Sequence, residues 1–558
     1  MPSSISSNSS GGVKAEKVPV IGANEHDARV SHQTADLLVD EDDAMLAARM
    51  GHKSEFAREF KSFSTISYAF AIMGLVSSVA TTFNSPFTLG GPAATVWTWF
   101  MGSCFNMTLG LSIAELVSAY PSAGGLYSAS GLLVPRKQRA FVAWLTGWLN
   151  FTGQIAGIAG TEYGLSQMIF AWAYVITKGR YVATTGATVG LYIALLALHG
   201  VINCFGIKTL ARLTSSYVIV NLGITFIIII VVLAKTPLDQ MHSAAYTFTT
   251  LDNQSGWSSS GLAFFFGLYC VQFVMTDYDA TAHISEEVSR AAIAAPVAIV
   301  VAVAGTGAVG WVLNIVMVLV SGDVGSTDIS TWPGGLAFAQ ILYLRAGRVG
   351  FLIIWPFVCS VAFFVVTTAL QANARSFYAF SRDNALPDRG FFARINKRTG
   401  TTVNAVWLVV FPCMALGCLA FASYTAVTAI FALAALGMDS SYLVPIVARW
   451  IYWDHPDVQF KPGPFTLGRG LLGKTINGIA ICWTMFECVV LAIPTVKPIS
   501  AINFNYSWVI MMGILLLASI WFVSYAHKHY QGPRSTLTPE QQQSLGVVSR
   551  DEEGVHHH

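Results

Sequence analysis

Long apolar runs recur along most of this 558-residue chain and predict an all-α membrane protein. A run of about 20 apolar residues is long enough for one helix to cross a bilayer. Twelve such runs predict twelve transmembrane helices, at residues 62–88, 91–119, 139–173, 182–203, 210–234, 261–288, 292–321, 348–380, 403–422, 425–452, 475–495 and 505–527. The tails at 1–60 and 531–558 are polar, and we expect both to be largely disordered.

The composition supports the same class of protein. Hydrophobic residues make up 54% of the chain and charged residues only 11%, whereas soluble domains carry about 25% charged residues. The net charge is +2 and no polybasic run is present, so we expect no nucleic-acid partner. The cysteines lie in or beside apolar runs without C-x-x-C spacing, so we expect neither a metal site nor a cofactor.

The distribution of lysine and arginine predicts that both termini face the cytoplasm. In that orientation the inner loops hold most of the basic residues, including Arg382, Arg389, Arg394, Lys397 and Arg398. The outer loops hold fewer, among them Lys178, Arg180, Lys235 and Lys497. We expect a multi-pass protein of the plasma membrane rather than of an internal membrane.

The membrane domain at 61–530 divides into two halves of opposite topology, because five spans reverse the direction of the chain. Residues 62–234 form the first repeat and 261–452 the second, and 475–527 supply two additional helices. The first span of each half is interrupted, by Gly74 and its small neighbours in one and by Asp277 and Asp279 in the other. A charge at mid-membrane costs about 2.5–3.5 kcal/mol on insertion scales unless it is compensated. Paired interruptions of this kind predict an inverted-repeat transporter with its site between the repeats.

Three local motifs carry a resemblance to a known family. Residues 114–127 (AELVSAYPSAGGLY) are similar to the E-L-x-S-x-x-P-x-A-G-G-x-Y element of the amino acid-polyamine-organocation superfamily. Residues 278–287 (YDATAHISEE) resemble its (F/Y)-D-x-x-x-H-x-x-E-E element, and 371–387 (QANARSFYAFSRDNALP) its R-x-x-Y-A-x-x-R-D-x-x-L-P element. The likeness covers roughly residues 55–530 and is greatest to the fungal amino acid permeases of the GABA and choline group.

This resemblance implies a substrate site at the two interruptions. Amide N–H groups at a helix start favour a carboxylate, and free carbonyls at a helix end suit an ammonium group. The implied substrate contacts are Met73, Gly74, Leu75, Val76, Met275, Thr276, Asp277 and Tyr278, with Phe431 as a lid. Val76 replaces the second glycine of the family's first span, and Asp277 replaces a common glycine. Asp277 either faces the substrate amine or carries a proton, or it caps the inner half of its span, with Asp279 in the first turn.

The candidate residues for coupling transport to an ion are distributed over several spans. Some proton-driven relatives have a lysine in the fifth span, where alignment places Asn221, which cannot titrate. The other coupling candidates are Asp277, Glu115, His283, Glu287 and Asp439. Glu286 and Glu287 could instead pair with arginines as an inner gate, and Glu487 is expected to pair with a neighbouring helix.

We therefore predict a secondary active transporter that imports amino acids, with GABA as one candidate, by alternating access. The expected partners are a small amino acid or amine, a proton as candidate coupling ion, and the lipid bilayer. A choline or polyamine permease is the alternative if Asp277 is the principal contact, and a nutrient sensor is an alternative of another class. H-E-x-x-H, G-x-S-x-G and P-loop motifs are absent in a suitable context, so we expect no enzyme.

Overall fold

The computed structural model describes residues 56, 58–322, 324, 332–422, 424–458, 460–501 and 503–533. Within these residues the protein is helical, and its only β pairing is an isolated bridge between Phe60 and Val288. Ten helical stretches of the described chain are long and apolar enough to cross a membrane. The protein is therefore the all-α, multi-span membrane protein that the apolar runs predict.

Helices stand at all twelve predicted positions. The first half comprises α2 (Ser62–Met73), α3 (Leu75–Thr82), α4 (Asn84–Leu89), α5 (Gly91–Ala119), α7 (Arg139–Ile176), α8 (Thr185–Asn203), α9 (Ile207–Thr214) and α10 (Tyr217–Lys235). The second half comprises α12 (Ser260–Phe265), α13 (Leu268–Val274), α14 (Ala280–His283), η2 (Ser285–Glu287), α15 (Ala291–Leu319), α17 (Ala337–Arg382), α18 (Val403–Gly417) and α19 (Tyr424–Ile451). The two additional helices are α20 (Leu471–Ala492) and α21 (Ser507–Ser524).

Two predicted spans are not among the ten apolar stretches. One is α7, whose inward-facing side chains include the buried polar residues Asn150, Gln154 and Glu162. The other is the sixth span, which is divided into the short helices α12, α13 and α14. A helix that is surrounded by protein needs fewer apolar residues than one that faces lipid. Of these two spans, the sixth is the one in which the sequence predicts a break.

Some boundaries differ from the predictions. The eighth span begins at Ala337 rather than at 348, because a bend at Gly347 (φ 70°, ψ 174°) joins a further helical segment to it. The loop after the second span also folds into a helix, α6 (Gly125–Leu132), all but the last residue of which is buried. That loop contains the A-G-G-x-Y part of the first motif, so the motif is a packed element.

Corresponding helices of the two halves make equivalent contacts. The second, third and fourth spans of one half pack on their counterparts in the other, as α5 on α15, α7 on α17 and α8 on α18. The contact of α7 with α19 has its counterpart in α17 with α10, and that of α2 with α15 in α13 with α5. This matching is what an inverted repeat requires.

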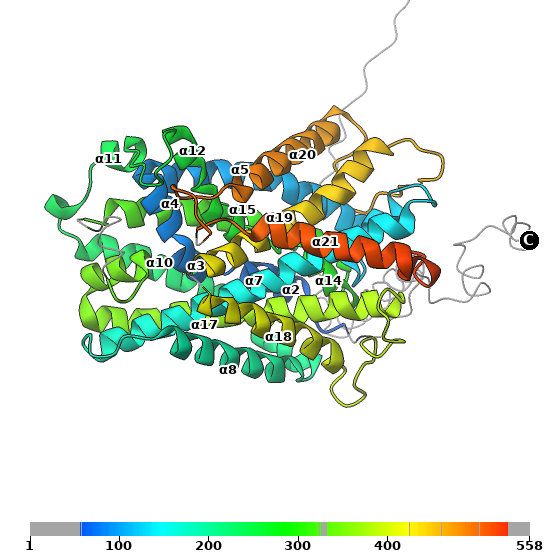
Figure 1. Ribbon diagram of the computed structural model, residues 1–558, viewed down its shortest axis with the longest axis horizontal. Coiled ribbons are helices and arrows are strands. Elements are labelled where there is room, and N and C mark those ends of the chain that lie inside the picture. The colour runs from blue at the N-terminus through cyan, green and yellow to red at the C-terminus, as the bar shows by residue number, and fades with distance from the viewer. Residues whose placement is uncertain are drawn as a thin grey trace, which may run out of the picture.

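The broken first span runs through the middle of the bundle. In Figure 1, α2, α3 and α4 follow one another from the centre toward the end of the molecule where α11 (Ala244–Thr249) lies. The C-terminal end of α21 reaches the opposite end. That opposite end is the one predicted to be cytoplasmic.

Part of the predicted N-terminal tail is packed. Phe56 and Phe60 are buried, and the Phe60 amide donates to the Glu287 carbonyl at 3.0 Å while the Ser289 amide donates to the Phe60 carbonyl at 2.9 Å. Two apolar rings thereby anchor the start of the domain on the end of the sixth span. The rest of both predicted tails lies outside the described residues, apart from Arg58, Glu59 and 531–533.

Candidate functional site

The first span breaks at a single residue, Gly74, between α2 and α3. Gly74 has φ 49° and ψ 53°, a left-handed conformation that glycine adopts without a Cβ clash. Its amide donates to the Phe70 carbonyl (3.2 Å), and the next backbone bond is from the Ser78 amide to the Gly74 carbonyl (2.9 Å). A Cβ at Gly74 would overlap a methyl group of Val365 in α17. The break is thus confined to Gly74 and does not extend over its small neighbours, and it leaves the amides of 75–77 as the start of α3.

The sixth span opens over residues 275–279, between α13 and α14. Asp277 lies at its centre with φ 62°, a region that aspartate enters at a cost of about 1–2 kcal/mol. Its amide donates to the Tyr442 hydroxyl at 3.0 Å. That hydroxyl donates in turn to Asp279 Oδ1 at 2.7 Å. Tyr442 of α19 therefore binds both acidic residues of the break, through the backbone of Asp277 and the side chain of Asp279.

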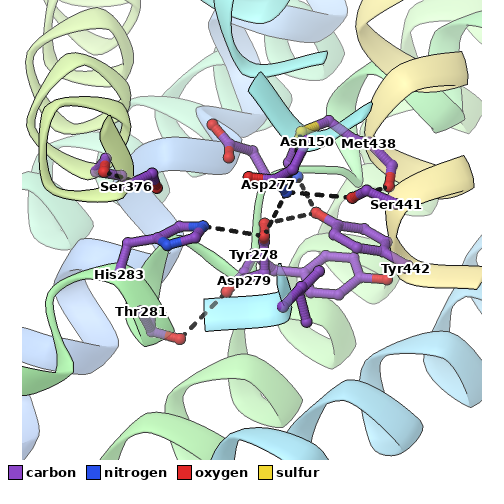
Figure 2. A network of polar contacts seen from close by, with 12 residues as sticks. Asn150, Asp277, Tyr278, Asp279, Thr281, His283, Ser376, Met438, Ser441 and Tyr442 are labelled. Atoms are coloured by element: carbon purple, nitrogen blue, oxygen red, sulfur yellow. Dashed lines mark hydrogen bonds and ion pairs between the residues drawn. The ribbon is translucent and has the colours of Figure 1, made fainter. Parts of the chain in front are cut away.

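Asp279 is the centre of a buried polar network, shown in Figure 2. Besides Tyr442, Asn150 Nδ2 of α7 donates to its Oδ2 at 3.0 Å, and His283 Nε2 lies 3.3 Å from the same oxygen. The other ring nitrogen of His283 lies 3.0 Å from the Ala123 carbonyl. Asp279 occupies the N-cap position of α14 but makes no side-chain capping bond. The interpretation of Asp279 as a first-turn residue that answers the helix dipole is therefore too narrow, because its carboxylate joins three spans.

Asp277 differs from its neighbour in the environment of its side chain. Its Oδ1 is buried and has no hydrogen-bond partner among the described residues. No dashed line reaches its carboxylate in Figure 2, only its backbone amide. None of the ion pairs in the described part of the chain includes it. Asp277 is thus a carboxylate at mid-membrane that lacks the donors given to Asp279.

Opposite helix ends meet at the two breaks. The outer pieces α3 and α13 pack together, as do the inner pieces α2 and α14. Amide groups at the start of α3 and carbonyl groups at the ends of α2 and α13 therefore converge near the centre of the bundle. Asn221 of α10 donates from Nδ2 to the Phe70 carbonyl at 3.2 Å. At the position where some relatives carry a lysine, this chain places a neutral donor against the end of α2.

The remaining predicted contact residues lie along the same breaks. Those that are buried are Met73, Leu75, Val76, Met275, Thr276 and Tyr278. Met73 Sδ accepts from the Thr306 hydroxyl and Met275 Sδ from the Ser103 hydroxyl, each at 3.3 Å. Both methionine side chains are therefore directed at α15 and α5. Met73 and Met275 therefore direct their backbone, rather than their side chains, toward the centre of the two breaks.

A cavity of about 270 Å³ lies beside α3 and α4, toward the end of the protein that is predicted to face outward. Its lining includes Thr81, Asn84, Gln167, Tyr269, Phe431 and Asn505. The ring of Phe431 lies 4.7 Å from that of Phe273 in α13. Phe431 thus lines the cavity and contacts α13, and its role as a lid stays a prediction.

Ion pairs close the opposite side. Glu287 pairs with Arg375 of α17, and Arg375 Nη1 also donates to the Thr402 hydroxyl at 2.7 Å. Glu286 lies 3.3 Å from Arg382. The inner end of the sixth span is thus tied to the eighth span, which supports a gate for Glu287 rather than a free proton carrier.

Two other coupling candidates interact with α20 or with the loop before it. Glu115 accepts from the Thr466 hydroxyl at 2.8 Å and from the Leu467 amide at 2.9 Å, so it fastens the loop before α20. The side chain of Asp439 in α19 interacts with that of Glu487 in α20. Glu487 thus contacts a neighbouring helix, as expected.

Asn150 and Tyr442 were missed as site residues from the sequence. Both are buried, and both support Asp279. The only sequence signal for these two residues is a polar group within an apolar span. Among the described residues no group of three or more His, Cys, Asp or Glu side chains could hold a metal ion.

Comparison with known proteins agrees with this architecture. Residues 63–515 match the family model described as Amino acid permease. An uncharacterized amino-acid permease of Schizosaccharomyces pombe is 39% identical over 92% of this chain and 93% of its own length. Amino-acid permease 2 of Neurospora crassa is 33% identical over 87% of this chain and 88% of its own. A GABA-specific permease of Saccharomyces cerevisiae is 28% identical over 89% of this chain and 87% of its own.

Proposed function

The chain belongs to the amino acid permease family, and we propose that it binds its substrate between the two helix breaks, with Asp277 as the partner of the amine. Family membership makes it an amino acid transporter. We propose the substrate, the direction of transport and the residues that bind the substrate.

The observation that carries the proposal is the unpartnered carboxylate of Asp277. Asp277 is partly buried, and its buried Oδ1 atom has no hydrogen-bond partner among the described residues. A carboxylate shielded from water without a counter-charge is unfavourable. A substrate ammonium group would supply both the missing charge and the missing donors. The nearby start of α3 offers amides for the substrate carboxylate. One zwitterion thereby satisfies both sites.

The structure favours a substrate without a bulky α-substituent. Val76 is buried in the first turn of α3, where the family more commonly has glycine, so its side chain takes space beside the amides. GABA carries no substituent next to its carboxylate. The relative of Saccharomyces cerevisiae named as GABA-specific supports GABA or another ω-amino acid as the substrate.

The structure corresponds to a transporter whose inner gate is shut. The two ion pairs of Glu286 and Glu287 close one side, and a cavity approaches Phe431 from the other. With both termini in the cytoplasm, that cavity faces outward, and import requires the ion pairs to part. A plasma membrane location follows from the proposed role in uptake.

A choline or polyamine permease is the second candidate, because Asp277 alone could bind a cation. Choline has no carboxylate, so the amides of α3 would then lack an anionic partner. A nutrient sensor would bind the same zwitterion without accumulating it.

Uptake into proteoliposomes tests the proposal. Labelled GABA should accumulate, with competition by other ω-amino acids but weak competition by bulky α-amino acids, choline and spermidine. Competition mainly by choline or spermidine would favour the second candidate. Binding without accumulation would favour the sensor.

A further inference from the structure

We propose that Asp439 and Glu487 share a proton and form the proton-binding site that couples transport to a pH gradient. The inference rests on the proposed transport function and adds a coupling site outside the substrate site. The proton moves from outer water to this pair and later to inner water, so no other reactant is needed.

The pair joins two spans deep in the protein. Asp439 is 2% exposed and Glu487 is 0% exposed. Their side chains interact, and their chain neighbours Ser440 and Cys488 are in contact, with Oγ 3.6 Å from Sγ. Ionised carboxylates only accept hydrogen bonds, so contact between two of them requires a proton on one. Asp439 Oδ2 and Glu487 Oε1 receive no hydrogen bond from any other described group. Two like charges at such a distance are not both sustained away from water.

The surroundings contain neutral donors and no cation. Gln272 Nε2 of α13 donates to Glu487 Oε2, and Gln272 in turn accepts from Asn106 Nδ2 at 2.7 Å. The titratable groups that face the pair are Tyr278, Asp279 and Cys488. None of the ion pairs found in the described chain brings Lys, Arg or His to either carboxyl group. A proton is therefore the positive charge that is available to neutralise the pair.

An independent observation comes from Tyr278. Its hydroxyl is fully buried and has no hydrogen-bond partner among the described residues, and among the charged groups Asp439 and Glu487 act on it most strongly. A buried hydroxyl without a partner costs about 1–3 kcal/mol. An unpartnered hydroxyl beside the pair indicates that Tyr278 gains and loses a hydrogen-bond partner during function.

The pair is linked to the segment that must move. Gln272 lies in the last turn of α13, directly before the break, and Tyr278 lies within the break beside Asp277. The Tyr278 ring is 5.1 Å from that of Tyr442, which binds the Asp277 amide. Displacement of α13 would withdraw the Gln272 donor from Glu487. Proton affinity would then depend on the state of the break.

The pair lies close to the cavity that Phe431 lines. Val490 and Leu491, three and four residues after Glu487, line that cavity, as does Tyr269, three residues before Gln272. Residues at these spacings lie on one helix face. The pair is therefore about one helical turn, or roughly 5 Å, beyond the cavity lining.

The test compares Glu487→Gln and Asp439→Asn with wild-type protein in proteoliposomes. Glu162→Gln is the matched control, because Glu162 is another fully buried carboxylate, bound to His199 at 2.8 Å. Both pair variants should keep exchange of internal for external substrate but lose about tenfold or more of the accumulation driven by an outside-acid gradient. The control should keep that accumulation. Gradient-driven accumulation by Glu487→Gln equal to wild type would overturn the inference.

A second measurement does not depend on active variants. Infrared difference spectra of the wild-type protein across a pH titration should show a protonated carboxyl band that Glu487→Gln removes and Glu162→Gln retains. The same band in Glu487→Gln would also overturn the inference. Absence of all transport by the wild type would refute the proposed function instead, so the two failures are distinguishable.

Discussion

The Tyr442 hydroxyl lies 3.0 Å from the Asp277 amide and accepts its hydrogen bond. The same hydroxyl donates to the Asp279 carboxylate. One side chain of the tenth span thereby fixes both the backbone and the buried carboxylate of the broken sixth span. This relationship explains how an unwound segment stays ordered between two helices.

Tyr442→Phe should weaken this arrangement. The substitution keeps the ring and removes both hydrogen bonds, and an unsatisfied buried group costs about 1–3 kcal/mol. Thermal unfolding in detergent should shift to lower temperature, and uptake should fall. Tyr452→Phe is the matched control, since the Tyr452 hydroxyl binds the exposed Gln138 at 2.9 Å. Equal effects of the two substitutions would show that the Tyr442 hydroxyl has no special role.

Asp279→Asn should destabilise the protein more than Asp277→Asn. Asp279 accepts from Tyr442 and Asn150, and an amide in its place would set a donor against a donor at about 1–3 kcal/mol. Asp277 Oδ1 has no hydrogen-bond partner among the described residues, so Asp277→Asn breaks no hydrogen bond at that atom. Melting temperatures of the two purified variants check the order, and the reverse order would contradict the structure.

Gly74→Ala should impair folding or transport through backbone strain and overlap with Val365. The left-handed conformation alone costs an alanine about 1 kcal/mol. The double variant Gly74→Ala/Val365→Ala should recover part of the loss, because it removes the overlapping methyl groups. Full activity of Gly74→Ala alone would mean that the break does not depend on this glycine.

Arg375→Gln should destabilise the closed inner gate. It leaves Glu287 buried without its counter-charge, at about 3–5 kcal/mol. Arg382→Gln should have a smaller effect, because that pair is more exposed, at 9% and 12% for Arg382 and Glu286. Thermal unfolding and protease access from the inner side measure both. A larger effect of Arg382→Gln would contradict this account of the gate.

The apolar runs were sufficient to predict the twelve spans, and Gly74 and Asp277 were sufficient to locate the two breaks. The length of an apolar run and the glycine or charged residue that interrupts it are local features, so both can be recognised in the sequence. The roles of Asp277 and Asp279 could not be separated in this way. They depend on Asn150 and Tyr442, which are distant in the chain and approach only after the helices pack.

Glu115 illustrates the same limit. A carboxylate within a motif and a span suggests function from the sequence, yet the structure shows it fastening the loop at 466–467. The pairing of Asp439 with Glu487 was equally hidden, because the relative rotation of two helices decides whether their polar side chains meet.

The central claim is that the Asp277 carboxylate binds the substrate amine, and binding to purified protein tests it most directly. GABA and butyrate differ by the amine alone, so displacement of labelled GABA by each measures the contribution of the amine. Wild-type protein should prefer GABA to butyrate by about tenfold or more, and Asp277→Asn should lose most of that preference. An undiminished preference in a folded Asp277→Asn variant would contradict the account.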